Sequence, residues 1–177
     1  YRPGNIYYTE VSEQMDLQGK KVIVIGLGKS GMAAYELLKT MGAEVCLYDG
    51  KEDLELPVRD VPVYLGNIPE DVIKELDCAV FSPGVPLQIQ AAQELRKHNV
   101  PFIGEIELAW LCEKGRVIGI TGTNGKTTTT TLTGEIVKAY FDQTFVVGNI
   151  GNPYTKEAGK TTEESVTVAE ISSFQLE

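Results

Sequence analysis

A lysine and a threonine follow a glycine-rich turn in the second half of the chain, where residues 117–128 read VIGITGTNGKTT. This segment reads as an apolar strand, a turn and a helix. In such an arrangement the backbone N–H groups of the turn and the positive N-terminus of the helix bind a phosphate. In such a turn Lys126 reaches the terminal phosphates, and the hydroxyl of Thr127 can bind Mg²⁺. The pattern predicts a nucleoside triphosphate site formed by Gly122, Thr123, Asn124, Gly125, Lys126, Thr127 and Thr128.

The turn differs from the commonest phosphate-binding sequence, G-x-x-x-x-G-K-[ST]. That pattern requires glycine at position 120, where this chain has Ile120, and Gly119 comes one residue too early. The shorter form GTNGKTT still keeps the strand, the glycines, the lysine and the helix in the order that phosphate binding requires. The alternative is a tight turn between a strand and a helix with an exposed lysine.

A second glycine turn, Gly26-x-Gly28-x-x-Gly31, lies near the start of the chain. It stands between an apolar run and a helical pattern, which is the context of a dinucleotide-binding turn. Asp49 ends the next predicted strand, where its carboxylate can accept hydrogen bonds from a ribose or a base. The pattern indicates a nucleotide or diphosphate ligand without distinguishing NAD from another nucleotide. The alternative is a close-packed turn that binds nothing.

Three further segments carry polar groups at the ends of predicted strands. Ser82 and Gly84 follow one buried strand, and Asn149 follows another. Glu170 ends an apolar strand, where a carboxylate beside a phosphate-binding turn suits Mg²⁺. Each has a plainer interpretation as a rigid loop, an ordinary turn or a solvated glutamate.

Strands alternate with helices along the chain, which predicts parallel sheets of the α/β class. We expect a lead-in arm over 1–17, a Rossmann-like domain over 18–112, and an incomplete P-loop-type α/β domain over 113–177. The last of these shows three strands, one evident helix and an open sheet edge. The predicted strands are 20–25, 44–48, 61–65, 78–81, 100–103, 116–120, 144–147 and 166–171, and the helices are 32–41, 69–76, 88–98, 105–112 and 126–140.

Composition excludes several classes of protein. The 177 residues carry a net charge of −9 without a cluster of lysines and arginines, so we expect no nucleic-acid partner. No stretch has the length of a membrane span or the pattern of a signal peptide, so we expect a cytoplasmic protein. Cys46, Cys78 and Cys112 lack metal or redox spacing and are predicted to be buried reduced thiols. His98, the only histidine, is predicted to be a surface or capping residue.

Taken together, the motifs resemble the Mur ligases, the ATP-dependent enzymes that add amino acids to peptidoglycan precursors. The resemblance covers residues 17–177 and is closest to the branch that adds D-glutamate to UDP-N-acetylmuramoyl-L-alanine. It rests on GLGxxG at 26–31, SPG at 82–84, GxIEL at 104–108, TGTNGKTT at 121–128, GNIG at 148–151 and ExSSFQLE at 170–177.

The resemblance implies roles for individual residues. Lys126 and Glu170 would be catalytic, and Thr127 and Glu170 would bind Mg²⁺ beside ATP. The reaction would pass through an acyl phosphate, which the amine of D-glutamate converts into an amide. Contacts with the UDP-muramoyl substrate are implied for Gly28, Lys29, Ser30, Asp49, Ser82, Gly84, Asn149 and Ser172.

In the family, a histidine, a carbamylated lysine and the D-glutamate domain come after the position of Glu177. We therefore expect the chain alone to lack ligase activity while still binding the UDP-sugar. The first glycine turn by itself leaves two alternatives open, namely an NAD-dependent oxidoreductase and a non-catalytic nucleotide-binding module. The sequence does not indicate whether the protein is a monomer or an oligomer.

Overall fold

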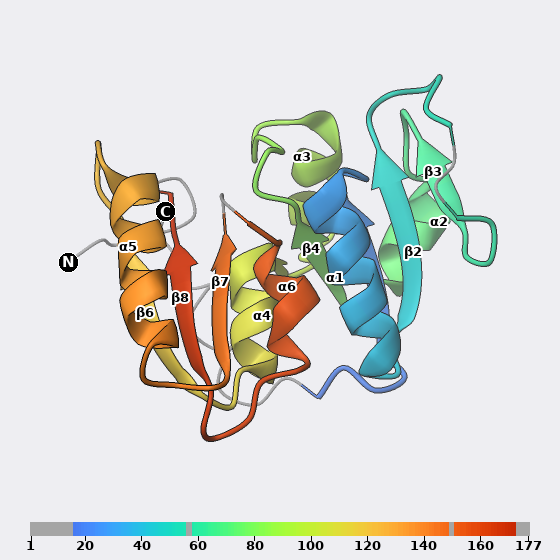
Figure 1. Ribbon diagram of the computed structural model, residues 1–177. Coiled ribbons are helices and arrows are strands. Elements are labelled where there is room, and N and C mark those ends of the chain that lie inside the picture. The colour runs from blue at the N-terminus through green and yellow to red at the C-terminus, as the bar shows by residue number, and fades with distance from the viewer. Residues whose placement is uncertain (1–15, 56–57, 149–150, 173–177) are drawn as a thin grey trace.

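Two parallel sheets, lying side by side, make up the protein (Figure 1). The structure, a computed structural model, describes residues 16–55, 58–148 and 151–172. The first sheet has the strand order β3-β2-β1-β4-β5, which is the Rossmann order, and all four pairings are parallel. Its strands are β1 Lys21–Ile25, β2 Glu44–Asp49, β3 Val63–Leu65, β4 Cys78–Phe81 and β5 Phe102–Gly104. The predicted α/β class is confirmed.

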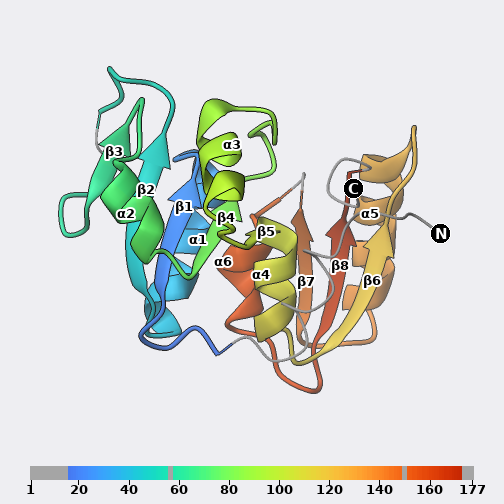
Figure 2. The same ribbon diagram turned by 180° about the vertical axis from the view of Figure 1, so that it is seen from behind.

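Helices cover both faces of the first sheet (Figures 1 and 2). Val22 and Val24 of β1 point into one core with α1 and α4, whereas Ile23 and Ile25 point into the other with α2 and α3. Burial on both faces explains why β1 is an unbroken run of branched apolar residues. The helices are α1 Lys29–Thr40, α2 Glu70–Glu75, α3 Gln90–Lys97 and α4 Glu105–Cys112.

The second sheet has the order β6-β8-β7 and is also parallel. Its central strand β8 is buried along its whole length, whereas β6 lies at an edge and is partly exposed. It contains the strand, turn and helix of a P-loop-type unit. Its elements are β6 Arg116–Ile120, β7 Thr144–Gly148, β8 Val166–Glu170, α5 Lys126–Lys138 and α6 Tyr154–Ala158.

Helix α6 corrects the prediction of a single evident helix in the second unit. It escaped detection because five residues are too few to show a helical repeat; the local signals are Pro153 at its N-cap and Gly159 at its C-cap. Figure 1 shows α6 between α1 and α4, and its buried Tyr154 and Ala158 share a core with Ala109 of α4. The two units are therefore packed together through α6.

The start of α1 also differs from the prediction. The helix begins at Lys29 and not at residue 32, with Gly28 as its N-cap. The glycine turn therefore leads directly into the first helical turn, and no side chain caps that end. At the other end, Gly42 has φ +76°, as expected of a glycine that terminates a helix.

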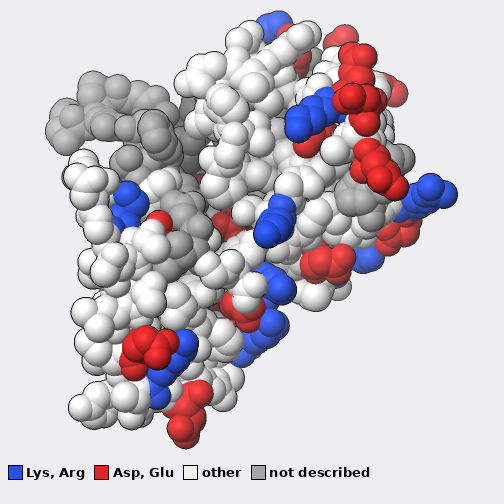
Figure 3. Space-filling model, turned by 45° about the horizontal axis from the view of Figure 1, so that its top comes forward, with Lys and Arg blue, Asp and Glu red and all other residues white. Residues whose placement is uncertain are grey.

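Charged side chains of both signs lie on the molecular surface (Figure 3). On the face shown in Figure 3, lysine and arginine side chains are interspersed with aspartates and glutamates. Across the described residues, none of the helices combines the length and the apolar character needed to span a bilayer. His98 occupies the C-cap of α3, as predicted.

The three cysteines are free thiols. Cys78 is buried as predicted, whereas Cys46 and Cys112 are only partly buried. Burial raises the pKa of Cys78 to about 12 and that of Cys46 to about 11, so both remain neutral at physiological pH.

Candidate functional site

The first glycine turn is held by the strand next to it. Gly26 has φ +92°, and its N–H donates to the carbonyl of Tyr48 at 2.8 Å. The N–H of Leu27 donates to Oδ2 of Asp49 at 2.9 Å, while Oδ1 accepts from the N–H of Lys51 at 3.0 Å. Asp49, predicted to contact a ribose or base, therefore also fixes the shape of the turn.

The loop after β4 closes against the same turn. The hydroxyl of Ser82 donates to the carbonyl of Gly26 at 2.8 Å, and Ser82 is buried. A Cβ on Gly31 would lie 1.8 Å from that carbonyl oxygen, so only glycine allows α1 to start so close to β1. The Ser82 hydroxyl is therefore already occupied by the backbone of the turn.

A cavity of about 480 Å³ opens between the turn, the Ser82 loop and the second unit. A Cβ added to Gly28 or Gly84 would meet no atom within 4 Å, so both backbones face open space. The uncapped N-terminus of α1 lies beside that space and suits an anionic group. Six of the residues predicted to contact the substrate line this cavity, namely Gly28, Lys29, Ser30, Asp49, Ser82 and Gly84. Glu105, Gly148, Gly151 and Pro153 also line it.

The lysine turn lies at the start of α5. Gly122 and Gly125 have φ of +147° and +74°, so this backbone path favours glycine at both positions. The Nζ atom of Lys126 donates to the carbonyl of Gly122 at 2.6 Å, which folds the lysine over the turn. Thr123, Asn124, Thr127 and Thr128 are exposed at the same place, so the turn is open to a ligand.

Glu170 is buried beside this turn. It pairs with Ile120, the last residue of the strand that leads into the turn, and only 4% of its surface is exposed. Its Oε2 atom has no hydrogen-bond partner within the described part of the chain. The alternative of a solvated glutamate is therefore wrong.

A buried carboxylate oxygen without a partner suits a hard cation such as Mg²⁺. Among the residues that the structure describes, no three histidine, cysteine, aspartate or glutamate side chains gather into a metal cluster. Mg²⁺ commonly takes only one or two carboxylates from a protein and completes its coordination with phosphates and water. The unpartnered oxygen of Glu170 fits that mode.

One predicted substrate residue lies near the end of the second sheet. Ser172 follows β8 by two residues and is half-buried, and Asn149 lies outside the described residues. The strand arrows of both sheets in Figure 1 point to the same side of the molecule. The two glycine turns therefore open on one side, each at the carboxyl end of its own sheet, where α/β proteins bind ligands.

The Mur ligase MurD-like N-terminal domain matches residues 20–104, and the Mur ligase middle domain matches residues 120–177. The chain belongs to the Mur ligase family. Proteins called UDP-N-acetylmuramoylalanine–D-glutamate ligase in Lachnoclostridium phytofermentans and Lachnospira eligens are 50% and 49% identical to it.

Both alignments cover 92% of this Mur ligase chain and 38% of the relative. The chain thus spans well under half the length of these relatives. A solved pseudomurein peptide ligase type C from Methanothermus fervidus aligns at 26% identity and TM-score 0.49, over 87% of this chain and 33% of that one.

Alanine substitutions at two glycines of the first glycine motif of this Mur ligase should have different effects, one on ligand affinity and the other on stability. Gly28→Ala should leave the melting temperature nearly unchanged, because φ is −72° and the new methyl meets open space. The methyl would intrude on the cavity, so a nucleotide that binds there should bind about tenfold more weakly, with UDP as the probe in calorimetry. Gly31→Ala should cost about 3 kcal/mol of stability or prevent folding, because of the overlap with the Gly26 carbonyl. A stable Gly31→Ala protein that binds UDP normally would contradict this account.

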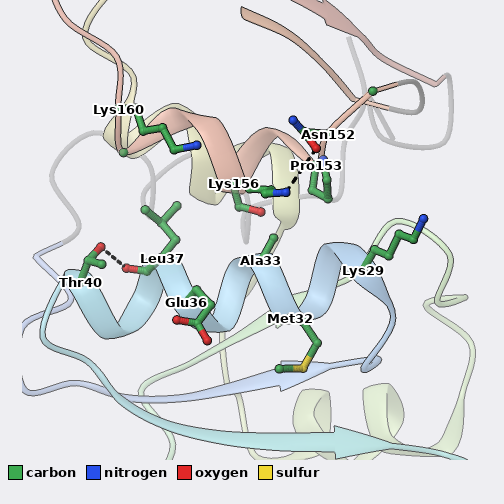
Figure 4. Close-up of a pocket in the computed structure, with 13 residues that line it drawn as sticks. Lys29, Met32, Ala33, Glu36, Leu37, Thr40, Asn152, Pro153, Lys156 and Lys160 are labelled. Carbon is green, nitrogen blue, oxygen red and sulfur yellow. Dashed lines mark hydrogen bonds between the residues drawn. The ribbon is translucent and has the colours of Figure 1, made fainter. Parts of the chain in front are cut away.

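A wider groove of about 750 Å³ runs between α1 and α6 (Figure 4). Met32, Ala33 and Leu37 form part of its α1 wall, and Lys156 and Lys160 stand on the α6 side. Lys29 lines both this groove and the smaller cavity, and of the predicted site residues that the structure describes it alone lines the groove. The larger hollow of this Mur ligase is therefore not the one that its motifs predict.

Sequence reasoning assigned no role to Glu105, which lines the smaller cavity and is 3% exposed. It is the first residue of α4, directly after β5. The available signal was a carboxylate at the junction of a strand and a helix, inside the GxIEL motif of the Mur ligase resemblance.

Proposed function

We propose that this chain is part of an ATP-dependent ligase that joins D-glutamate to UDP-N-acetylmuramoyl-L-alanine through an amide bond. The observation that carries the proposal is the buried Glu170, with its unpartnered oxygen, on the strand beside the lysine turn. The names of the Lachnoclostridium phytofermentans and Lachnospira eligens relatives support the same reaction. Because the chain spans 38% of their length, the activity is proposed for the whole protein.

In this proposal the first unit binds the UDP part of the substrate. The diphosphate would lie at the N-terminus of α1, against the backbone of Gly28, Lys29 and Ser30. Asp49 would accept a hydrogen bond from the uridine side, and Gly84 would allow close approach of the loop after β4. Asn149 and Ser172 would contact the muramoyl end, nearer to the second sheet.

The second unit would bind ATP on the lysine turn. The substrate carboxylate attacks the γ-phosphorus as the bond to the leaving ADP breaks, giving an acyl phosphate. The amine of D-glutamate then attacks the acyl carbon, phosphate leaves with the bonding electrons, and the amine proton passes to solvent. Lys126 would neutralise charge on the transferring phosphoryl group.

Thr127 and Glu170 would hold Mg²⁺, which supplies positive charge where two anionic groups meet. The roles expected for the domain spans 18–112 and 113–177 follow this division, with 1–17 as a lead-in arm. Since the reaction uses ATP and a UDP-linked precursor, we place the protein in the cytoplasm.

An amide-forming assay tests the proposal. The whole protein is incubated with ATP, Mg²⁺, UDP-N-acetylmuramoyl-L-alanine and D-glutamate, and ADP and the amide product are measured together. We expect equal amounts of both, no product with L-glutamate, and binding without turnover for the 177-residue chain. Product formation by the chain alone would contradict the last expectation, and absence of product from the whole protein would overturn the function.

The first glycine turn is also compatible with a second function, that of an NAD-dependent oxidoreductase. Titrating the protein with NADH and with the UDP-sugar separates the two. The ligase proposal expects saturable binding of the UDP-sugar only, and tight NADH binding would favour the oxidoreductase.

A further inference from the structure

Helix α6 touches the first unit through a buried carboxylate. Oε1 of Glu105, at the start of α4, accepts the N–H of Thr155 at 2.8 Å and the hydroxyl of Thr155 at 2.7 Å. Glu105 is 3% exposed and Thr155 is 2% exposed, so water does not compete for these hydrogen bonds. Burial holds the pKa of Glu105 above its usual value, and the hydrogen bonds from Thr155 offset part of that rise.

The same contact shapes the substrate cavity. Glu105 itself lines the cavity, and so do Gly151 and Pro153, which lead into α6. Thr155 comes two residues after Pro153, so the bond that holds Thr155 also limits where Pro153 can lie. The first glycine turn and the start of α1 line the same cavity as Glu105, Gly151 and Pro153.

A second carboxylate holds the neighbouring residue from the other end of α4. Oε2 of Glu113 accepts the hydroxyl of Tyr154 at 2.8 Å and that of Thr167 at 3.0 Å. Glu113 lies away from the cavity, whereas Glu105 lines it. Anchoring of α6 is thus shared by two glutamates, of which only Glu105 is placed to affect a ligand.

We propose that Glu105 is a positioning residue for the UDP-sugar, which sets the width of the cavity by fixing the start of α6 through Thr155. This inference rests on the proposed function. A ligand held between two units binds more tightly when their walls already stand at the right separation, because a preorganised cavity loses less conformational freedom on binding. ATP binds elsewhere in this scheme, so its affinity should not depend on Glu105.

The test measures KM for each substrate in the whole protein. For Glu105→Ala we expect KM for the UDP-sugar to rise about tenfold, with KM for ATP within about twofold of wild type. Glu105→Gln keeps an acceptor oxygen for Thr155 and should recover most of the affinity. Thr155→Val should weaken UDP-sugar binding in wild type but add little to Glu105→Ala, because both changes remove the same contact.

Glu107→Ala is the matched control. Glu107 is on the same helix, and its Oε2 accepts the N–H of Gly104 at 2.6 Å without reaching α6. It should lower the melting temperature, because the hydrogen bond to Gly104 is lost, while leaving both KM values unchanged. Equal changes in both KM values for Glu105→Ala, or a change in neither, would overturn the inference.

Hydrogen exchange over 151–159 separates this inference from the proposed function. Glu105→Ala should speed exchange there in the unliganded protein, and Glu107→Ala should not. If the wild-type protein binds no UDP-sugar, the proposed function fails, and exchange alone decides whether Glu105 holds α6. Unchanged exchange in Glu105→Ala would overturn the inference whatever the activity.

Discussion

Lys126→Met is expected to lower amide formation by the whole protein about a thousandfold. The lysine amine lies over the turn, 2.6 Å from the carbonyl of Gly122, at the N-terminus of α5. A positive charge at this point stabilises the negative charge that develops on the transferring phosphoryl group, and methionine keeps the length of the side chain without the charge. The measurement is kcat from ADP release at saturating substrates.

Lys138→Met is the control for this change. Lys138 is the last residue of the same helix and is half-exposed in an ion pair with Glu135 at 3.0 Å. We expect its kcat to stay within about twofold of wild type, since a surface ion pair contributes little. The melting temperature of Lys126→Met should also be close to wild type. A Lys126→Met protein that retains a tenth of the activity would contradict the assignment of Lys126 to the phosphoryl group.

The elements that carry the two turns could be predicted because local signals agree there. Strand β6 Arg116–Ile120 matches its predicted bounds, α5 begins at Lys126 as predicted, and β1 differs by one residue, whereas α1 begins three residues earlier than predicted. Branched apolar runs followed by glycine leave few alternatives to a buried parallel strand. The order of the strands in each sheet could not be predicted in this way, because it depends on long-range packing and not on local sequence patterns.

The polar contacts that define the cavity could not be predicted in the same way. Ser82 bonds to Gly26, and Glu105 bonds to Thr155, over separations of 56 and 50 residues. Sequence spacing places each residue at the end of its own element but does not say which loops meet. The short helix α6 was missed for a related reason, since packing against α1 and α4 stabilises it more than its own five residues do.

The position of Glu170 at a strand end could be predicted, but its burial could not. A strand-end glutamate is usually solvated, and here β6 and β7 flank it on both sides. Gly148 of β7 approaches so closely that a Cβ would lie 2.2 Å from the carbonyl oxygen of Glu170. The tight packing of the neighbouring strand backbone accompanies a side chain that is 4% exposed, with Oε2 unpartnered within the described part of the chain.

Glu170→Gln is expected to separate stability from function. Burying an unpaired charged oxygen is costly, so the variant should melt at the same temperature as wild type or higher when no ligand is present. Its amide lacks the charge that Mg²⁺ requires, so kcat of the whole protein should fall about a hundredfold or more. Melting curves and ADP release measure the two effects.

Magnesium makes the same test without turnover. Mg²⁺ added with a non-hydrolysable ATP analogue should raise the melting temperature of wild type, because a ligand that binds only the folded state stabilises it. The rise should be much smaller for Glu170→Gln and normal for Glu164→Gln, an exposed glutamate that precedes the same strand. A Glu170→Gln protein that is less stable without ligand but equally stabilised by Mg²⁺ would mean that Glu170 serves the fold and not the metal. If Glu170→Gln is instead at least as stable without ligand and is hardly stabilised by Mg²⁺, the charge of Glu170 lowers the stability of the fold and serves metal binding.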